Sequence, residues 1–480
     1  MTTLAPRYPS LLKSHLYRWP TERLIGACGW RESAIPGFIE RPMPEPEHAL
    51  ARDSRWPAMF PSAICLVTTG DGKISAVEKV VGPCIVNRFP FVMSLSFCRC
   101  SLSSRHYARR RFMELLEANG TAALQFLPPG PKLSHTLACI ERIPDERTTE
   151  RLSATGLETR PALCSASPVF QDSYLVYEGR LVRPGKDFDG EPIFNRPYSD
   201  IGSHRIYFFE VEAIQLREDL ASGAAQLQWQ SLPDWQPRST EHGLRPVDWS
   251  ARPAGKYIKG FTPYYAFPSA STIAFASDGH AHGMAYKRLP PLPEDQVEVD
   301  NDAARWPCFF PSSLGIITSW CSDGRPNVMP CGSTVVVSRS PLSIGIAIGY
   351  ARINERYAPR ASLDNLLRTR RFGCGVGYAS LELAEAIRYV GTTSIVDDPG
   401  KLDHAGLMLI TDLDQPLLAA LPVHFDCRIV HEQRLGTHIL FVGEVERILC
   451  RSDVDEDNAL TWAPFAAIWD SHGQVGPRGT

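Results

Sequence analysis

This chain of 480 residues lacks several features that would each assign it to a broad class. No run of about twenty apolar residues could span a bilayer, and the first 19 residues have no continuous apolar core like that of a signal peptide. The 13 cysteines contain no Cys-x-x-Cys pair typical of zinc sites, and their odd number suits a reducing compartment. The formal net charge is only −3, so nothing points to nucleic acid or to an anionic membrane. We expect a cytoplasmic protein without metal, membrane or nucleic-acid partners.

What the sequence does contain is a long internal repeat. The segment Arg-Trp-Pro-Ala-Met-Phe-Pro-Ser at 55–62 returns as Arg-Trp-Pro-Cys-Phe-Phe-Pro-Ser at 305–312, and 202–212 is echoed by 436–446. A period this long excludes solenoids and propellers, whose units have roughly 20–50 residues. We therefore predict one domain duplicated in tandem.

Composition divides the chain into four parts. Proline takes every second place from Pro42 to Pro46, which forbids a long helix and predicts an extended arm lying on the body of the protein. A proline-rich stretch between the repeats predicts a semi-rigid linker. The predicted parts are an N-terminal arm at 1–54, copy one at 55–285, a linker at 286–300 and copy two at 301–480.

Both copies contain strand-like runs of apolar, β-branched and aromatic residues. The predicted strands are 63–69, 91–97, 122–127 and 206–214 in copy one, and 314–320, 342–349, 373–378 and 438–449 in copy two. Helical spacing predicts helices over 111–119 and 363–371 in matching places, and another over 380–389. Many short strands with few short helices predict two mainly β, barrel-like domains.

Three further patterns each have two interpretations. Arg109, Arg110 and Arg111 belong to the densest basic cluster, which could grip a phosphate or an acidic substrate or could begin a solvated helix. The repeated Arg-Trp-Pro motif could stack on a planar ligand or form a lid over a barrel end. His280 and His282 have a spacing that could serve a metal, but no third ligand is evident nearby, so no metal site is predicted.

The stretch Asp-Gly-Arg-Pro-Asn-Val-Met-Pro-Cys-Gly-Ser-Thr at 323–334 resembles the signature of the flavin reductase-like family. Segments 389–394 and 401–407 are similar to two later motifs of that family, and 436–445 is similar to its last core strand. The resemblance covers nearly all of copy two. It implies an FMN-binding split barrel of the Greek-key type, usually dimeric, with flavin near the subunit interface. The duplication then implies an intramolecular pseudo-dimer, and further oligomerisation is left open.

The resemblance also implies a set of cofactor-binding residues in copy two. A hydroxyl and free amides at a helix N-terminus suit a phosphate, which favours Ser362. A glycine such as Gly332 lets the backbone approach a ligand closely. The full set is Asn327, Val328, Met329, Cys331, Gly332, Ser333, Thr334, Arg360, Ser362, Ser394 and Lys401.

Copy one departs from this pattern at most of these places. The segment after Asp71 lacks the Asn and the Met of the signature and contains Glu78 in what is expected to be a loop. The counterpart of Ser362 falls at Arg111. Copy two itself has Pro330 where relatives often have Thr, which removes a hydroxyl and an amide donor. A standard flavin site is therefore expected in copy two only.

His204 and His438 occupy matching places and are candidate catalytic residues. In the family, a histidine here often lies near the flavin or the nicotinamide, where a group that titrates near neutrality could steer proton or hydride chemistry. The structural alternative is a histidine that caps a barrel strand.

The resemblance implies an FMN-dependent oxidoreductase that takes hydride from NADH or NADPH and passes electrons to free flavin, oxygen or an organic substrate. The redox chemistry would belong to the cofactor, and the protein would bind and orient it. The expected partners are a small-molecule substrate or free flavin, and a monooxygenase. Two alternatives remain: a specialised biosynthetic or degradative enzyme whose copy-one site takes the substrate, and a non-catalytic flavin-binding protein.

Overall fold

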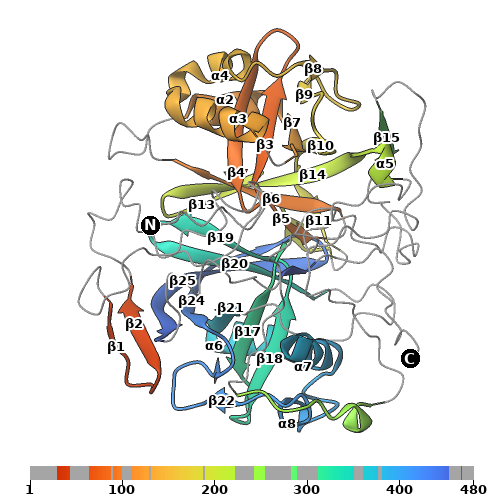
Figure 1. Ribbon diagram of the computed structural model, residues 1–480. Helices are drawn as coiled ribbons and strands as arrows, with labels where there is room; N and C mark the ends of the chain where they lie inside the picture. Colours follow the sequence, from red (N-terminus) through yellow and green to blue (C-terminus); the bar gives the residue numbers. More distant parts are fainter. Residues whose placement is uncertain are drawn as a thin grey trace.

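The computed structural model describes residues 30–43, 64–87, 90–99, 110–128, 131–187, 190–221, 243–253, 283–288, 312–350, 360–376, 381–452 and 466–467. Two nine-stranded antiparallel sheets dominate this part of the chain, one above the other in Figure 1. Each sheet curls around its own core, and a few short helices cover it. This arrangement confirms the predicted fold class, two tandem split barrels that are mainly β.

The upper sheet belongs to copy one. Its strands are β3 (Ile64–Gly70), β4 (Ser75–Val81), β5 (Cys84–Asn87), β6 (Val92–Cys98), β7 (Thr121–Phe126), β10 (Leu175–Leu181), β13 (Tyr198–Ile201), β14 (His204–Arg217) and β15 (Met284–Arg288). The helices are α2 (Arg111–Asn119), α3 (Pro131–Arg142), α4 (Thr148–Ala154) and α5 (Glu218–Ala221), with 3-10 turns η2 (Asp145–Arg147) and η4 (Trp249–Ala251). Short hairpins are β8 (Thr159–Arg160) with β9 (Val169–Phe170), and β11 (Gly185–Lys186) with β12 (Pro192–Ile193).

The lower sheet belongs to copy two and includes part of the N-terminal arm. Its strands are β1 (Arg31–Glu32), β2 (Phe38–Pro42), β17 (Gly315–Trp320), β18 (Pro326–Cys331), β19 (Thr334–Arg339), β20 (Leu342–Gly349), β21 (Arg371–Val376), β24 (Val423–Arg434) and β25 (His438–Arg451). The helices are α6 (Ala361–Thr369), α7 (Leu381–Thr392) and α8 (Lys401–His404). The short pairs are β16 (Ser312–Ser313) with β26 (Ala466–Ala467), and β22 (Leu409–Ile410) with β23 (Leu417–Leu418).

The two sheets have the same strand order. Copy one runs β4-β3-β7-β10-β14-β6-β5, and copy two runs β18-β17-β21-β24-β25-β20-β19. The long strands β14 and β25, of 14 residues each, pair with different neighbours along their length and so join the two halves of each barrel. Each strand in one copy therefore has a definite counterpart in the other, which allows the two copies to be compared residue by residue.

Each copy receives an edge strand from the segment that precedes the other copy. Strand β2, ahead of copy one, pairs with β25 of copy two from Phe38↔Arg451 onward, and lies beside it in Figure 1. Strand β15, ahead of copy two, pairs with β14 of copy one in the equivalent register, from Met284↔Arg217. A glycine with positive φ precedes both, Gly37 at +80° and Gly283 at +79°. This reciprocal exchange covers one sheet edge in each copy, where unpaired backbone groups would otherwise be exposed.

The copies pack against each other through a shared apolar cluster. It is formed by Cys84, Val86, Val92, Val182, Ile193, Phe194, Ile201, Ile206 and Phe208 from copy one and by Val335, Val337, Ala347, Leu435, Leu440 and Val442 from copy two. Separate clusters fill the two barrels, around Phe112 and Tyr207 in copy one and around Leu366 and Phe441 in copy two. Because the interface cluster is as buried as the two cores, the pseudo-dimer is one packed unit.

Hydrogen bonds cross the same interface in pseudo-symmetric places. Asn87 Oδ1 accepts from Thr437 N at 3.0 Å, Thr437 Oγ1 at 2.9 Å and His438 N at 3.0 Å. On the other side, Ser203 N donates to Ser340 O at 2.7 Å. Gly202, with φ of +50°, lies so close to Ser340 that a Cβ would come within 2.4 Å of that carbonyl. The chain turn before β14 and the turn before β25 are thus both held by the other copy.

The predicted elements agree with the structure in type and differ by a few residues at their ends. The helix predicted over 111–119 is α2, whereas the one predicted over 363–371 begins and ends two residues earlier, as α6. Helices α3 and α4 and strands β4, β10, β18 and β24 were not predicted. The Arg-Trp-Pro motifs at 55–57 and 305–307, His280, His282 and Arg109 lie outside the described residues.

We expect Asn87→Ala to destabilise the whole protein, because it leaves the buried backbone N–H groups of Thr437 and His438 without their acceptor. The cost should be about 2–4 kcal/mol, measured by urea denaturation. The matched control is Ser338→Ala at the pseudo-equivalent position, where the only hydroxyl contact among the described residues is with Ser203 Oγ at 3.5 Å. Its cost should be about 1 kcal/mol or less. Equal effects of the two substitutions would contradict this account of the interface.

Candidate functional site

Strand β18 and the first turn of α6 bring two of the predicted cofactor-binding residues together. Asn327 Nδ2 donates to Ser362 Oγ at 2.8 Å, and both side chains are buried. Asn327 Oδ1 is also buried and has no hydrogen-bond partner in the described part of the chain. Among the described residues, no side chain caps the N-terminus of α6, where the first backbone N–H groups lack intrahelical acceptors. The junction therefore combines buried polar atoms with a helix N-terminus that favours a negative charge.

Lys401, at the start of α8, reaches the same strand from the other side. Its Nζ donates to Val328 O at 3.0 Å and to Thr393 O at 3.3 Å, and the residue is only 3% exposed. Burial lowers the pKa of Lys401 to about 7, although its electrostatic interactions with Cys321 and Asp398 act in the opposite direction. Lys401 can therefore exchange a proton near neutral pH, and an anion placed beside it would favour its charged form.

The remaining predicted residues lie in three places: the junction of β18 and α6, the chain after Thr393, and the turn between β18 and β19. Arg360 and Met329 belong to the junction, with Arg360 Nη1 3.8 Å from Met329 Sδ. Ser394 follows Thr393 and accepts a hydrogen bond from Val396 N at 3.2 Å. The buried turn between β18 and β19 holds Cys331, Gly332, Ser333 and Thr334. There the Thr334 hydroxyl is already used, because it donates to Cys331 O at 2.6 Å.

Two polar residues of this region were missed from the sequence. Thr393 has a buried hydroxyl without a partner among the described residues. Asn365 is buried one helical turn after Ser362 and donates from Nδ2 to Ser319 Oγ at 3.1 Å. Both could have been predicted from the sequence, because Thr393 adjoins the predicted Ser394 and Asn365 lies on the same helix face as the predicted Ser362.

The equivalent place in copy one has different residues. Strand pairing and helix bounds align β4 with β18 and α2 with α6. This alignment corrects the expected counterpart of Ser362, which is the fully buried Phe112 and not Arg111. It also places Glu78 in strand β4, not in a loop. The resulting pairs are Ala76 for Asn327, Glu78 for Met329, Arg110 for Arg360, Ile143 for Thr393 and Arg151 for Lys401.

In copy one, the chain supplies its own anion at this place. The Glu78 carboxylate, with its side chain 7% exposed, forms ion pairs with both Arg110 and Arg151, the latter at 2.6 Å. Arg110 also pairs with Asp145 at 2.9 Å. Arg151 donates to Ile143 O at 2.9 Å, as Lys401 does to Thr393 O. Glu78 and Asp145 together thus neutralise the two arginines from within the protein.

These contacts change the interpretation of the predicted basic cluster. Arg110 is held by two carboxylates inside copy one, which does not support its predicted role in binding a phosphate or a substrate. Arg111 lies on the surface and pairs with Glu114 of its own helix at 3.3 Å. The alternative interpretation, the start of a solvated helix, fits Arg111, whereas the side chain of Arg110 is mostly buried.

The two candidate histidines lie at the interface between the copies. His204 Nδ1 accepts from Arg339 N at 3.4 Å and lies 2.9 Å from Ser203 Oγ. Burial, together with the charges of Arg339 and Arg110, lowers the pKa of His204 to about 3, so its imidazole is neutral at pH 7. His438 is buried, with its Nδ1 2.8 Å from Thr437 Oγ1. Both residues begin a long strand, β14 and β25, which is the position that the structural alternative expects.

Other classes of site are not evident. No group of three or more His, Cys, Asp or Glu residues within the described ranges could hold a metal ion. No helix in those ranges is long and apolar enough to cross a membrane.

Comparison with known proteins gives a family match in both copies. The sequence model described as "Flavin reductase like domain" matches residues 58–231 and 307–466. A stretch of 126 residues is 29% identical to an uncharacterized protein of Archaeoglobus fulgidus. That alignment covers 25% of this chain and 63% of the relative, so the chain spans less than two thirds of that relative's length.

Several solved structures are similar to between 31% and 38% of the chain. Flavoredoxin of Desulfovibrio vulgaris is 19% identical with a TM-score of 0.26, over 31% of this chain and 73% of that one. An FMN-binding protein from Thermus thermophilus is 19% identical with a TM-score of 0.26, over 31% and 77%. Nitrilotriacetate monooxygenase component B from Bacillus cereus is 16% identical with a TM-score of 0.32, over 38% and 94%.

We expect the stability of the protein to depend on the titration of Lys401. The native pKa is near 7 and the ordinary value is 10.5, so the unfolded chain binds more protons between these two pH values. The free energy of unfolding should therefore rise with pH across this window because of Lys401, by at most about 1.4 kcal/mol per pH unit. Lys401→Met should remove this rise and stabilise the ligand-free protein at pH 7.

The measurement is urea denaturation at pH 7, 8 and 9, compared with the exposed control Lys73→Met. The difference between wild type and Lys401→Met should change with pH, whereas the difference between wild type and Lys73→Met should not. A pH-independent difference for Lys401→Met would show that its ammonium group keeps an ordinary pKa in the folded protein.

Proposed function

Because this chain belongs to the family of flavin reductase like domains, we propose that copy two binds FMN and that the protein is a flavin-dependent oxidoreductase. The observation that carries this proposal is a difference at one pair of equivalent positions: copy one has Glu78 where copy two has Met329. Copy one fills the place with its own carboxylate, whereas strand β18 of copy two supplies none. Copy two nevertheless keeps a lysine, Lys401, where copy one has Arg151. A ligand that brings its own negative charge, such as a flavin phosphate, would complete the site.

The residues present in copy two fit such a ligand. Asn327 Oδ1 and Thr393 Oγ1 are buried polar atoms without partners in the described ranges, and such atoms are costly unless a ligand or water satisfies them. Ser362 offers a hydroxyl beside the N-terminus of α6, a position that suits a phosphate. We infer that Ser362, Asn327 and Lys401 hold the cofactor, with Arg360 and Ser394 beside them.

FMN, when bound, supplies the capacity to accept a hydride and to pass electrons onward. The chain's own residues would bind it, orient it and exclude water from its buried side. Lys401 Nζ would hold a proton near the ligand at neutral pH, because its pKa of about 7 allows both protonation states. In copy one, Phe112 and the ion pairs of Glu78 fill the same place. The proposal is therefore one flavin per chain, reduced by NADH or NADPH, with free flavin, a small organic molecule or a monooxygenase as the acceptor.

We expect Ser362→Glu to abolish FMN binding, because it places a carboxylate where the phosphate would bind and breaks the contact with Asn327. The Kd for FMN, measured by quenching of flavin fluorescence, should rise by on the order of a hundredfold, equivalent to about 3 kcal/mol. The matched control is Arg111→Glu in the first turn of α2, which should leave the Kd and the stoichiometry of one FMN per chain unchanged. Loss of binding in the control but not in Ser362→Glu would place the site in copy one.

We expect the FMN-loaded protein to be yellow and to lose its visible absorbance when NADH or NADPH is added without oxygen, because the bound flavin is reduced. Stopped-flow absorbance would measure the rate. The Asn87→Ala variant at the interface serves as a control for general loss of structure. A protein that binds FMN but is not bleached by either nicotinamide is a flavin-binding protein or an enzyme with another reductant. A protein that takes up no FMN contradicts the proposal itself.

A further inference from the structure

A segment that follows copy one in the sequence is docked on copy two. Gly243 O accepts from Met408 N at 3.0 Å, Arg245 N donates to Gly406 O at 2.8 Å, and Leu244 and Leu407 form a β-bridge. This backbone pairing runs antiparallel beside α8 and β22, where the segment is drawn in yellow-green at the lower edge of Figure 1. The segment 243–251 therefore binds copy two as a short extended peptide.

An aromatic side chain anchors this peptide. The indole of Trp249 lies 5.5 Å from the ring of Tyr389, centroid to centroid, and its Nε1 donates to Glu385 Oε2 at 3.1 Å. The guanidinium of Arg388 lies 5.5 Å from the same indole. A tryptophan that buries apolar area and satisfies its N–H is a typical anchor for a docked segment.

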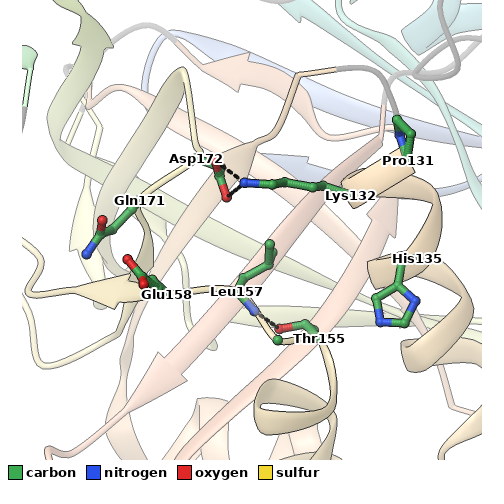
Figure 2. A pocket seen from close by; sticks show the side chains of 9 residues that line it. Pro131, Lys132, His135, Thr155, Leu157, Glu158, Gln171 and Asp172 are labelled. Carbon is green, nitrogen blue, oxygen red and sulfur yellow. Dashed lines mark hydrogen bonds and ion pairs between the residues drawn. The ribbon is translucent and has the colours of Figure 1, made fainter.

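The pseudo-symmetric groove in copy one is a cavity of about 550 Å³. Helix α3 corresponds to α7, and Gly156, with φ of +64°, corresponds to Gly406, with φ of +67°. The lining of the cavity includes Lys132 and His135 of α3, Gly156 and Glu158 after α4, and Asp172. Figure 2 shows these side chains around the opening, with Lys132 paired to Asp172 at 2.8 Å.

The backbone that would pair with a docked peptide is available in this groove. Gly156 O and Glu158 N are the counterparts of Gly406 O and Met408 N, and no backbone hydrogen bond within the described ranges engages either of them. His135 replaces Glu385 and can serve a polar group on an aromatic ring. Cys139 replaces Tyr389, and this smaller side chain leaves more room on the groove wall. Copy one thus keeps the backbone edge that could pair with a peptide. The place equivalent to the one that holds Trp249 has His135 and Cys139 instead of Glu385 and Tyr389.

We propose that this groove binds the N-terminal segment of the same chain, residues 4–12. The strands β2 and β15 already show that the regions preceding the two copies take pseudo-equivalent places. Segment 243–251 precedes copy two and docks on it, so its equivalent ahead of copy one should dock on copy one. Leu244 lies 40 residues ahead of Met284, the first residue of β15, and Leu4 lies 34 residues ahead of Phe38, the first residue of β2. The N-terminal segment therefore stands at nearly the pseudo-symmetric position in the chain.

The two segments also share a pattern. Leu4, Pro6 and Ser10 have the spacing of Leu244, Pro246 and Ser250. Tyr8 stands one place ahead of the position that would match Trp249, and a phenol has both an apolar ring and a polar tip. Docking would complete the two-fold symmetry: each copy would carry an edge strand from the region preceding the other copy and a docked peptide from the region preceding itself.

Photo-crosslinking of the full chain tests this inference. The photoreactive amino acid p-benzoylphenylalanine replaces Glu158, and crosslinked tryptic peptides are identified by mass spectrometry. Crosslinks to residues 1–13 are expected. The same substitution at Met408 is the matched positive control, because that position faces Gly243 and should crosslink to residues 239–252. Tyr8→Ala should lower the yield at position 158 about fivefold, whereas Tyr17→Ala should leave it unchanged.

Mixing chains labelled with 15N and unlabelled chains separates intramolecular from intermolecular docking. Crosslinks of single isotopic composition support the inference, and mixed crosslinks overturn it in favour of a second copy of this chain. Crosslinks to residues 468–480 also overturn it, because they would identify the C-terminal segment as the occupant. So does the absence of any crosslink at position 158 when the control at position 408 succeeds. The test does not depend on the proposed flavin chemistry.

Discussion

The structure depends on the burial of one barrel face against the other. The apolar cluster between the copies is as inaccessible to water as the two barrel cores, and a single buried oxygen, Asn87 Oδ1, satisfies two backbone N–H groups that begin β25. The exchange of β2 and β15 ties each copy to the region preceding the other. Two barrels connected only by a linker could separate, whereas these cannot separate without exposing both an apolar face and a sheet edge.

This permanent association allows the two copies to differ. A homodimer must use the same residues at both of its pseudo-equivalent places, but a duplicated chain need not. At the junction of β4 and α2 in copy one, Glu78 and Asp145 pair with Arg110 and Arg151, so the charges balance within the protein. In copy two, Met329 stands at the place of Glu78, and burial lowers the pKa of Lys401 to about 7. Copy one balances its buried charges with its own residues, whereas the proposed site in copy two would need an anionic ligand to do so.

Sequence patterns predicted the mainly β fold and the residues on which the proposed copy-two site is based. The motif at 323–334 led to Asn327 and Met329, and the helix start led to Ser362. In the structure, Asn327 contacts Ser362, and Met329 contacts Arg360. The alignment of copy one with copy two was not evident from the sequence, because copy one lacks the motif residues that would fix it before α2. As a result, Arg111 and not Phe112 was expected opposite Ser362. A shift of one residue on a helix moves a side chain by about 100° around the axis, from the buried face to the solvent, so this small error changed the chemistry inferred for copy one.

The sequence by itself determined that this protein is a duplicated, mainly β chain of the flavin reductase-like type, because a repeat and a local motif are both visible as order along the chain. Only the tertiary structure decided which charges meet, since Glu78, Arg110 and Arg151 are far apart in sequence and become partners through strand β4 and helices α2 and α4. It alone also showed that β2 and the segment 243–251 lie on copy two. Backbone pairing across such distances follows from the packing of whole sheets, which no local pattern encodes.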